Sequence, residues 1–298
     1  MHIKSIQVKK KIKFIINPLS GGKNKKGVPQ IIESVIDKSL FEIEYSVSES
    51  EVETMAIAAD SRKKQLDAII AIGGDGTINN IAKHLMGSEI ALGIVPMGSG
   101  NGFARELGIP VNAKKSLELI NRFNIKKVDT GLVNEQFFIN VCGVGFDAHV
   151  SSLFAGSKTR GFLNYARITL NEMNTYQPQI YELIIDGKNY TQKAFMLVVC
   201  NGTQFGNNAC IAPGAINDDG LFNITVIEDF KLLDAFGLIG HLFLRDIDKA
   251  RKVKTYTGKN IQLIRKNPGH VNIDGEPVLL NQNLNISVNP LSLNIIIP

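Results

Sequence analysis

Three glycine-rich turns in the first 102 residues carry the side chains best suited to phosphate chemistry. They read NPLSGGK at 17–23, GGDGT at 73–77 and PMGSGNG at 96–102. Glycines let the backbone approach a ligand closely, and the N-terminus of a following helix offers unpaired N–H groups to an anion. The carboxylate of Asp75 would repel a bare phosphate, so we expect a bridging metal ion or a substrate hydroxyl beside it. The alternative for Asp75 is a simple helix cap.

These turns do not match the two common glycine patterns of nucleotide-binding proteins. None fits G-x-x-x-x-G-K-[ST] or G-x-G-x-x-G, so neither a P-loop NTPase nor a dinucleotide-binding Rossmann domain is supported. The five histidines form no H-E-x-x-H cluster and no Ser-His-Asp order can be assigned, which leaves hydrolase chemistry without support. The three cysteines form no C-x-x-C pair, and we interpret them as core thiols of a cytoplasmic protein.

Alternating strand and helix signals place the three turns. Unbroken apolar runs at 13–17, 68–72 and 91–95 predict strands of a parallel sheet, and each leads directly into one turn. The intervening elements are predicted at 28–40, 41–47, 51–65 and 77–86. Turns that follow adjacent parallel strands face the same crevice, so the first half is expected to be a βαβα domain with an anion site.

After about residue 127 the pattern changes to short β-rich runs separated by turns. Strands are predicted at 128–132, 137–143, 180–185, 195–200, 221–227, 260–264 and 284–288, with helices near 158–173 and 232–244. This composition is typical of a mostly antiparallel β domain, and 298 residues suit two domains. No apolar stretch reaches the ~20 residues that a membrane-spanning helix needs.

The charge distribution is uneven along the chain. The formal net charge is +5, and eight lysines precede the first acidic residue, Glu33. Such a patch attracts phosphates or an anionic surface, although it is also compatible with a solvated face. We expect no nucleic-acid partner, and a homodimer remains a possibility.

Taken together, the segments NPLSGGK, GGDGTINN and GSGNGFAREL resemble the diacylglycerol kinase catalytic domain family, which also includes sphingosine, ceramide and bacterial lipid kinases. The later blocks INVCGVGFDA (139–148), APGAINDDGLFNITV (212–226) and IDGEP (273–277) extend the resemblance over nearly the whole chain. It implies a Rossmann-like, nucleotide-binding α/β domain at 1–127, similar to NAD kinases and phosphofructokinases. It also implies a lipid-binding antiparallel β-sandwich at 128–288, with 289–298 returning to the first domain.

The activity implied by this resemblance is transfer of the γ-phosphoryl group of ATP, with Mg²⁺, to a hydroxyl of a membrane lipid. The acceptor stays open among diacylglycerol, a sphingoid base, a ceramide and another long-chain alcohol. The form G-S-G-N at 98–101 resembles sphingosine and ceramide kinases, whereas many bacterial members have G-T-G-N-D. Two alternatives are phosphorylation of a soluble nucleotide such as NAD and a non-catalytic membrane-surface module.

The resemblance also assigns residues to the nucleotide. Those that match the family's nucleotide-contacting motifs are Asn17, Ser20, Gly21, Gly22, Gly74, Asp75, Gly76, Thr77, Gly98, Ser99, Gly100 and Asn101, with Glu276 in the IDGEP block. Arg105 lies one helical turn beyond Asn101 and could reach a phosphate or pair with a local acid.

The second half supplies the remaining candidates. Asp147 matches a position that faces the lipid headgroup, or else caps a helix, and Asp218 with Asp219 matches a metal-binding pair or a plain turn. Asp274 matches the catalytic carboxylate; we favour it as general base because it would approach from the acceptor's side, with Asp75 as the alternative. The apolar stretch 232–244 and the basic residues at 245–254 predict peripheral contact with an anionic membrane, unless that stretch only covers the sandwich core.

Overall fold

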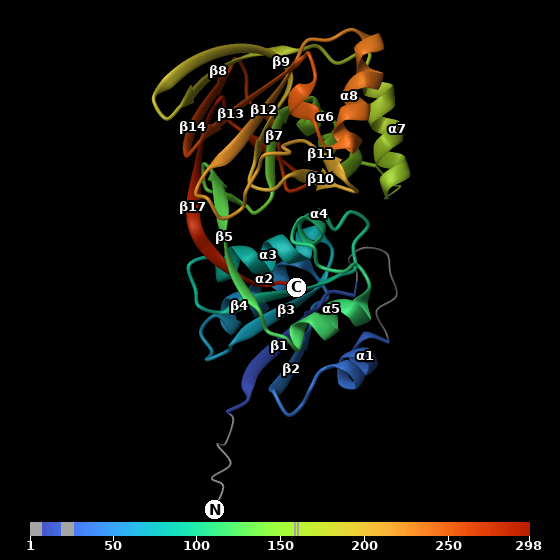
Figure 1. Ribbon diagram of the computed structural model, residues 1–298, viewed down its shortest axis with the longest axis vertical. Helices are drawn as coiled ribbons and strands as arrows, with labels where there is room; N and C mark the ends of the chain where they lie inside the picture. The colour runs from blue at the N-terminus through green and yellow to red at the C-terminus, as the bar shows by residue number, and fades with distance from the viewer. Residues whose placement is uncertain (1–7, 19–26, 158, 160) are drawn as a thin grey trace, which may run out of the picture. The chain divides into compact units, whose positions relative to one another are not determined.

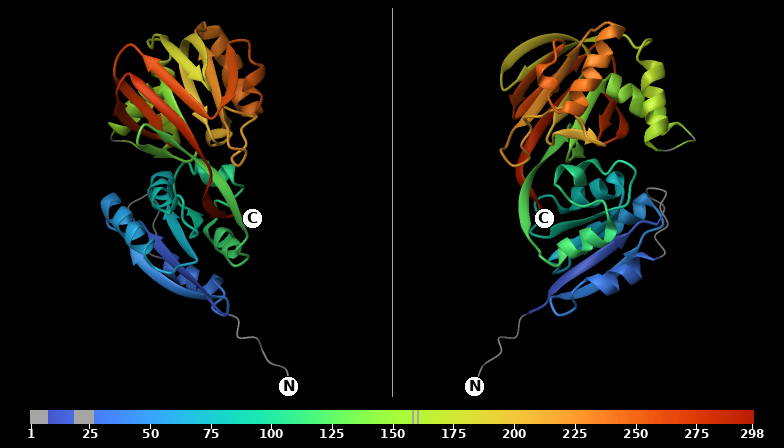
Figure 2. Two further views of the ribbon diagram at one scale, coloured as in Figure 1. Left: turned by 90° about the vertical axis from the view of Figure 1, so that its left-hand side faces the viewer. Right: turned by 45° about the vertical axis from the view of Figure 1, so that its right-hand side comes forward.

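The computed structural model describes residues 8–18, 27–157, 159 and 161–298. It divides into two compact units, one of residues 1–127 with 293–298 and the other of residues 128–292 (Figures 1 and 2). The predicted fold class is confirmed: the first unit is built on a parallel sheet and the second on antiparallel strands.

The first unit alternates strands and helices along the chain. Its elements are β1 (Lys10–Ile16), α1 (Val28–Val35), β2 (Phe41–Val47), α2 (Glu51–Ser61), β3 (Ala68–Gly73), α3 (Asp75–Leu85), β4 (Ala91–Pro96), α4 (Gly102–Glu106) and α5 (Ala113–Ile120). The last part of β17 (Asn283–Ile296) completes its sheet by pairing in parallel with β4, at Ile295 opposite Leu92.

The sheet order in this unit is β2-β1-β3-β4-β17, with every pairing parallel. The chain moves from β1 to β2 on one side and then to β3 on the other, so the direction of winding reverses between β1 and β3. In open α/β sheets, ligands bind beyond the carboxyl ends of the strands at such a reversal. The topology therefore predicts a ligand site near Asn17 and the turn that begins at Gly73.

Burial explains why these runs form a central sheet. Every residue of β3 and β4 is buried, as expected for strands covered by helices on both faces. Side chains of α1 and α5, including Ile32 and Leu117, pack against one face of the sheet with Ile70 in a single apolar cluster. The other helix pair, α2 and α3, packs together, and Ser50 caps α2 by accepting a hydrogen bond from the backbone N–H of Glu53.

The second unit contains most of the strands. Its elements are β5 (Ile125–Val133), β6 (Gln136–Phe138), β7 (Val141–Gly145), α6 (Phe146–Ala155), α7 (Phe162–Glu172), β8 (Gln179–Ile185), β9 (Lys188–Cys200), β10 (Gln204–Gly206), β11 (Ala209–Cys210), β12 (Phe222–Glu228), α8 (Leu232–Leu244), the 3₁₀ turn η2 (Ile247–Lys249), β13 (Val253–Gly258), β14 (Asn260–Arg265), β15 (Gly269–Ile273), β16 (Glu276–Leu280) and the first part of β17. Strand β5 begins in the first unit and continues into the second.

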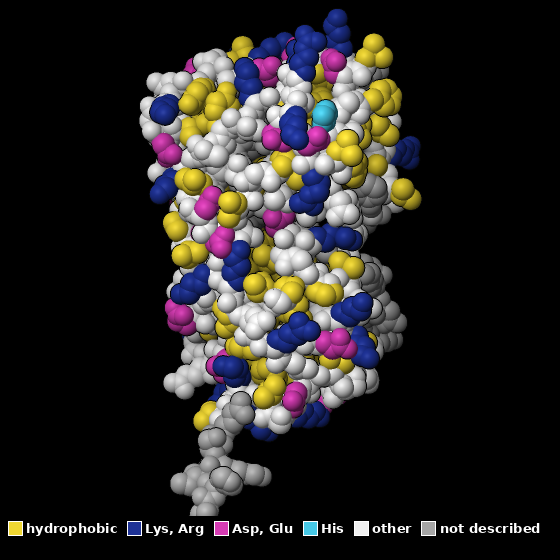
Figure 3. All heavy atoms as spheres, viewed as in Figure 1, with side chains coloured by type: hydrophobic (Ala, Val, Ile, Leu, Met, Phe, Trp, Pro, Cys, Tyr) yellow, Lys and Arg dark blue, Asp and Glu magenta, His cyan; other side chains and the backbone are white. Residues whose placement is uncertain are grey.

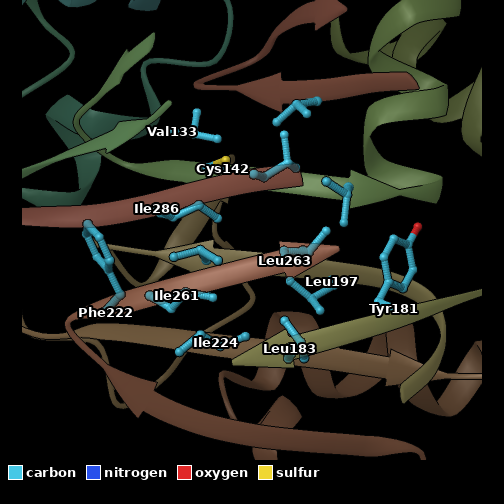
Figure 4. Packing of buried hydrophobic residues seen from close by; sticks show 14 of the residues in the cluster. Val133, Cys142, Tyr181, Leu183, Leu197, Phe222, Ile224, Ile261, Leu263 and Ile286 are labelled. Atoms are coloured by element: carbon cyan, nitrogen blue, oxygen red, sulfur yellow. The ribbon is translucent and has the colours of Figure 1, made fainter. Parts of the chain in front are cut away.

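Antiparallel pairing runs in the order β16-β15-β7-β9-β8-β14-β17; β12 pairs with β9, β13 pairs with β12, and β5 pairs with β17. Two apolar cores result. One lies between the layers of strands and contains Tyr181, Leu263 and Ile286 (Figure 4). The other contains Phe146, Val150 and Leu238, so it lies where α6, α7 and α8 cover the strands.

The sequence indicated helix α6 only through the alternative role of Asp147 as a helix cap; the cap position is Gly145 instead. Residues 137–143 were expected to be a strand and the next helix was expected near 158–173, whereas helix α6 occupies Phe146–Ala155 and α7 only Phe162–Glu172. In the first unit, α1 ends at Val35 and α2 at Ser61, earlier than the predicted 40 and 65. Among the described residues, no helix is both long enough and apolar enough to cross a membrane.

Candidate active site

Two of the three glycine turns lie against each other at the carboxyl ends of β3 and β4. The backbone N–H of Met97 donates to the carbonyl of Gly73 at 2.7 Å, which joins the start of one turn to the other. A Cβ atom on Gly98 would lie 2.7 Å from the Cα of Gly74, and one on Gly74 would lie 3.2 Å from the Cα of Gly98. Such close backbone contact leaves no room for side chains, so glycine is required at both positions.

Asn17, at the end of β1, is tied to the same region. Its backbone N–H donates to the carbonyl of Ile72 at 3.2 Å, and its Nδ2 donates to Oγ1 of Thr77 at 3.3 Å. Thr77 is buried in the first turn of α3, where Gly76 precedes it. Asn17, Gly76 and Thr77, which were predicted from the sequence, are thereby brought together. Ser20, Gly21 and Gly22, predicted in the same loop as Asn17, lie outside the described residues.

Asp75 is the first residue of α3, and its carboxylate is only partly satisfied. The Oδ1 atom is buried and accepts no hydrogen bond from any described residue. Burial raises the pKa of Asp75, and hydrogen bonding by the backbone N–H groups of Asn101, Gly102 and Phe103 opposes that rise. The carboxylate thus faces the turn that follows β4 and retains one oxygen for another group.

The turn after β4 is held by its own side chains. Asn101 is buried in a left-handed conformation with φ of 50°; its Oδ1 accepts from the N–H of Gly98 at 2.8 Å, and its Nδ2 donates to the carbonyl of Gly98 at 3.0 Å. Arg105 donates from Nε to the carbonyl of Gly100 at 3.2 Å. The sequence suggested a phosphate or a local acid as the partner of Arg105. The structure shows a different partner, a backbone carbonyl of the turn. Ser99 is exposed at its tip.

In the second unit, the side chain of Asp274 accepts backbone hydrogen bonds, a structural role that its motif did not indicate. Its Oδ2 accepts from the N–H of Ile139 at 2.8 Å, and its Oδ1 accepts from those of Asn140 and Val141 at 2.9 and 2.8 Å. Its own N–H donates to the carbonyl of Val141 at 3.0 Å. These four bonds fasten the turn between β15 and β16 to the start of β7. Asp274 has a φ of 48°, which is held by this set of bonds.

Asp147 lies behind the same turn, in the first turn of α6. The carboxylate is buried and accepts from Nδ2 of Asn272 at 2.8 Å, and Oδ1 of Asn272 accepts from the N–H of Gly275 at 2.9 Å. Burial raises the pKa of Asp147 to about 6, and the bond from Asn272 opposes the shift. Asn272 therefore connects Asp147 to the turn of Asp274. Sequence reasoning missed it, although its place two residues before Asp274 is a signal that could have identified it.

Asp218 and Asp219 lie on an exposed turn before β12. Asp219 accepts from the N–H of Leu221 through Oδ1 at 2.9 Å, as an acidic residue in a turn commonly does. Within the described part of the chain, no group of three His, Cys, Asp or Glu side chains is arranged to hold a metal ion. Glu276, at the start of β16, is also exposed.

A further buried acid, which sequence reasoning missed, positions that turn. Asp129 of β5 has no solvent exposure, and its Oδ2 accepts from the N–H of Gly220 at 2.7 Å. Its Oδ1 accepts from the N–H of Leu291 at 2.7 Å, and its own N–H donates to the carbonyl of Asn217. The signal available in the sequence was a single acidic residue inside an apolar run that is predicted to be a strand.

Comparison with known proteins agrees with this two-part arrangement. Residues 11–133 match the family model described as the diacylglycerol kinase catalytic domain. Residues 140–297 match the one described as the YegS C-terminal NAD kinase beta sandwich-like domain. The chain belongs to the diacylglycerol kinase catalytic domain family. The resemblance read from the glycine turns is thereby confirmed.

Relatives within this lipid kinase family match along most of the chain. The protein named "Probable lipid kinase YegS" from Escherichia coli is 31% identical over 248 residues, which are 80% of this chain and 81% of that protein. Diacylglycerol kinase from Bacillus subtilis strain 168 is 27% identical, and the match covers 90% of each chain. A crystal structure of a diacylglycerol kinase from Bacillus anthracis str. Sterne shares the fold, with a TM-score of 0.74 at 21% identity over 97% of both chains.

Proposed function

We propose that this kinase transfers the γ-phosphoryl group of MgATP to a hydroxyl group of a membrane lipid, with diacylglycerol or a similar long-chain alcohol as acceptor. The observation that carries the proposal is the pair of glycine turns after β3 and β4, whose backbones touch beside the buried carboxylate of Asp75. Membership of the lipid kinase family supports the same reaction class.

The turns have the properties of a nucleotide phosphate site. Glycine at 74 and 98 lets the backbones of the two turns touch, and glycine-rich backbone of this kind is typical of phosphate sites. Helix α3 begins inside the glycine turn at 73–77, and its N-terminus offers unpaired N–H groups. We assign nucleotide contacts to Asn17, Gly74, Gly76, Thr77 and the turn of 98–101, as the sequence predicts.

The donor set of Asp75 also suits the expected metal ion. The unpartnered Oδ1 is a hard oxygen of the kind that Mg²⁺ prefers, but the same oxygen cannot hold the ion and accept a proton at once; in the step proposed below it accepts the proton, and phosphate oxygens and water would hold the ion. When bound, Mg²⁺ would neutralise charge on the phosphates. Asp218 and Asp219 stay a candidate second metal pair; with no third carboxylate gathered there among the described residues, water would have to supply the other ligands.

Hydrogen bonding of the two candidate carboxylates favours Asp75 over Asp274 as the general base. Three backbone N–H groups donate to the carboxylate of Asp274, so both of its oxygens are already engaged in holding the turn. Asp75 has one oxygen without a partner among the described residues, and burial raises its pKa. Both properties suit a proton acceptor. We therefore exchange the roles preferred from the sequence and treat Asp274 as a positioning residue.

The chemical step then balances as follows. The oxygen of the lipid hydroxyl forms a bond to the γ-phosphorus of ATP, and the bond from that phosphorus to the β–γ bridging oxygen breaks. The hydroxyl proton passes to the carboxylate of Asp75, and ADP leaves.

The reaction is tested by incubating the full chain with radiolabelled ATP, Mg²⁺ and a panel of acceptors that includes diacylglycerol, sphingosine, ceramide, phosphatidylglycerol and NAD. We expect label in a lipid and none in NAD. Label in NAD alone would show a soluble-nucleotide kinase instead, and label in no acceptor would contradict the proposal.

The base assignment is tested by comparing Asp75→Asn with Asp274→Asn. Asp75→Asn is expected to lower kcat by about 10²–10⁴-fold, the usual contribution of a positioned base. Asp274→Asn replaces an acceptor oxygen with an NH₂ group that faces backbone N–H donors, so it should lower the unfolding temperature first. Asp60→Asn, at an exposed acid of α2, is the matched control. An Asp274→Asn protein of normal stability with no turnover would restore Asp274 as the base.

We also propose that α7 and α8 contact the membrane that holds the acceptor. Leu233 and Phe236 of α8 are 84% and 77% exposed, and Leu163 of α7 is 84% exposed. Both helices contribute to the same apolar core, and Figure 3 shows hydrophobic side chains gathered where they lie. The basic residues expected to contact the surface follow α8 at Arg245, Lys249, Arg251, Lys252 and Lys254. Each could contribute up to ~1 kcal/mol at an anionic surface.

Co-sedimentation with vesicles tests this contact. Leu233→Ser with Phe236→Ser should weaken partitioning at least about tenfold, because each buried Leu or Phe contributes about 1.5–3 kcal/mol. Val52→Ser, at a residue of α2 that is 71% exposed, is the control. Equal binding of the double variant and the control would contradict an inserted α8. Equal binding to neutral and anionic vesicles would contradict the electrostatic part.

A further inference from the structure

A pocket of about 470 Å³ lies in the second unit, and none of the carboxylates assigned above is among its lining residues. Its lining combines the start of α6, the segment before β8, the end of β14 and the turn between β14 and β15. The cationic and hydroxyl-bearing residues in this lining are His149, Tyr176, Tyr181, Arg265, Lys266 and His270. No acidic side chain belongs to it.

Arg265, at the end of β14, is a buried cation without a counter-ion. Its exposed fraction is 7%, and within the described part of the chain no carboxylate pairs with it. Its Nη1 donates to the carbonyl of His270 and its Nη2 to those of Gly269, Leu280 and Asn281. Its Nε is buried with no hydrogen-bond partner among the described residues. A buried charge that is neutralised only by carbonyl dipoles is costly, and an anion nearby would reduce that cost.

Two tyrosines line the same pocket. Tyr181 is the cross-strand partner of Arg265, and Figure 4 shows its hydroxyl directed away from the labelled aliphatic side chains of the core. It shares a hydrogen bond with Tyr176, whose hydroxyl also accepts from Nε2 of Gln179 at 3.1 Å. Burial raises the pKa of both tyrosines, so both hydroxyls keep their protons. One O–H of the pair therefore remains available to donate to a ligand.

The rim adds the positive charge of Lys266 and the imidazole of His270. Both side chains are exposed, on either side of Asn267, Pro268 and Gly269. Nε2 of His149 is hydrogen-bonded to Oε2 of Glu172 at 2.8 Å, so the nearby carboxylate of Glu172 already has a partner. The lining thus presents a guanidinium, an ammonium and phenolic donors in a space larger than one phosphate group requires.

We propose that this pocket binds a phosphate ester, with the phosphate near Arg265, Tyr176 and Lys266 and the ester's organic part in the remaining volume. None of the residues that line this pocket belongs to the glycine turns, and the proposal goes beyond the proposed reaction. The same chemistry is offered by the headgroup of a phosphorylated lipid and by a small soluble phosphate ester. A kinase with such a site would sense phosphorylated molecules in addition to consuming ATP.

Direct binding tests the proposal without turnover, so its outcome is independent of the reaction proposed above. Equilibrium binding of radiolabelled glycerol 3-phosphate and of inorganic phosphate is measured on the full chain, and co-sedimentation compares phosphatidylcholine vesicles with and without phosphatidic acid. The test variants are Lys266→Gln with His270→Gln, both at exposed positions, and Tyr176→Phe, which removes one hydroxyl. Lys188→Gln, at an exposed lysine outside the pocket, is the control.

Both test variants should bind the phosphate ester about tenfold more weakly than the control, as expected for loss of a charge or of a hydrogen bond to an anion. MgATP binding should not change, since the glycine turns are untouched. A loss confined to glycerol 3-phosphate assigns a soluble ester, and a loss confined to phosphatidic acid vesicles assigns a lipid headgroup. Affinities equal to those of Lys188→Gln for every probe would overturn the proposal.

Discussion

Replacing Gly98 with alanine tests whether the contact between the two glycine turns makes the nucleotide site. The added methyl carbon would lie 2.7 Å from the Cα of Gly74 and 2.9 Å from Oδ1 of Asn101. Ordinary carbon–carbon contacts are about 3.5–4.0 Å, so the turns would have to separate by about 1 Å. Gly98 does not have a positive φ, so the backbone conformation itself tolerates alanine and the steric contact alone decides the result.

Overpacking of this kind costs about 1–3 kcal/mol, which we expect as a lower free energy of unfolding. Displacement of the turn should weaken MgATP binding by at least about tenfold, equivalent to about 1.4 kcal/mol. Calorimetric titration with MgATP and thermal unfolding measure the two effects. Gly237→Ala is the control, because a Cβ there meets nothing within 4 Å and alanine favours its helix, α8. Normal MgATP affinity and normal stability of Gly98→Ala would refute the reasoning.

Two further substitutions test the buried acids of the second unit. The pKa of Asp147 is raised to about 6, so the folded state binds its proton more tightly than the unfolded state does; this group's contribution to stability is greatest near pH 4 and is lost as the pH rises through 6. Asp147→Asn should remove that loss, which is on the order of 2–3 kcal/mol at neutral pH, while lowering lipid phosphorylation if Asp147 faces the acceptor. Denaturant unfolding from pH 4 to 8 measures the difference, and parallel curves for both proteins would contradict it. Asp129→Asn should lower the free energy of unfolding by about 1–3 kcal/mol, because an amide offers one acceptor oxygen to the two N–H groups of Gly220 and Leu291. A variant as stable as the wild type would show that these bonds contribute little.

Local sequence signals predicted the first unit well. The runs at 68–72 and 91–95 are unbroken and apolar because both faces of those strands are covered, and the glycine turns follow them directly. The turn contacts then follow from topology, since neighbouring parallel strands end at the same edge. The closeness of Gly74 and Gly98 could therefore be anticipated from residue type and strand order.

The roles of the acids in the second unit could not be predicted in the same way. Asp274 accepts hydrogen bonds from residues about 135 positions earlier in the chain. No local pattern records such a pairing, so the motif alone presented Asp274 as a free carboxylate. Helix α6 was suggested only by the possible cap at Asp147, because glycines at 143 and 145 end a strand immediately before it and its apolar residues lack a clear helical period.

Strand β17 makes the first unit depend on the far end of the chain. Its first part pairs with β14 in the second unit, while Ile295 pairs with β4 and the N–H of Ile297 donates to the carbonyl of Asn124 in the first. During synthesis the fully buried strand β4 has no neighbour on that side until residues 293–296 have been made. An apolar edge left open for so long is prone to wrong pairing. The nucleotide-binding unit, though encoded first, is therefore the last to complete its sheet.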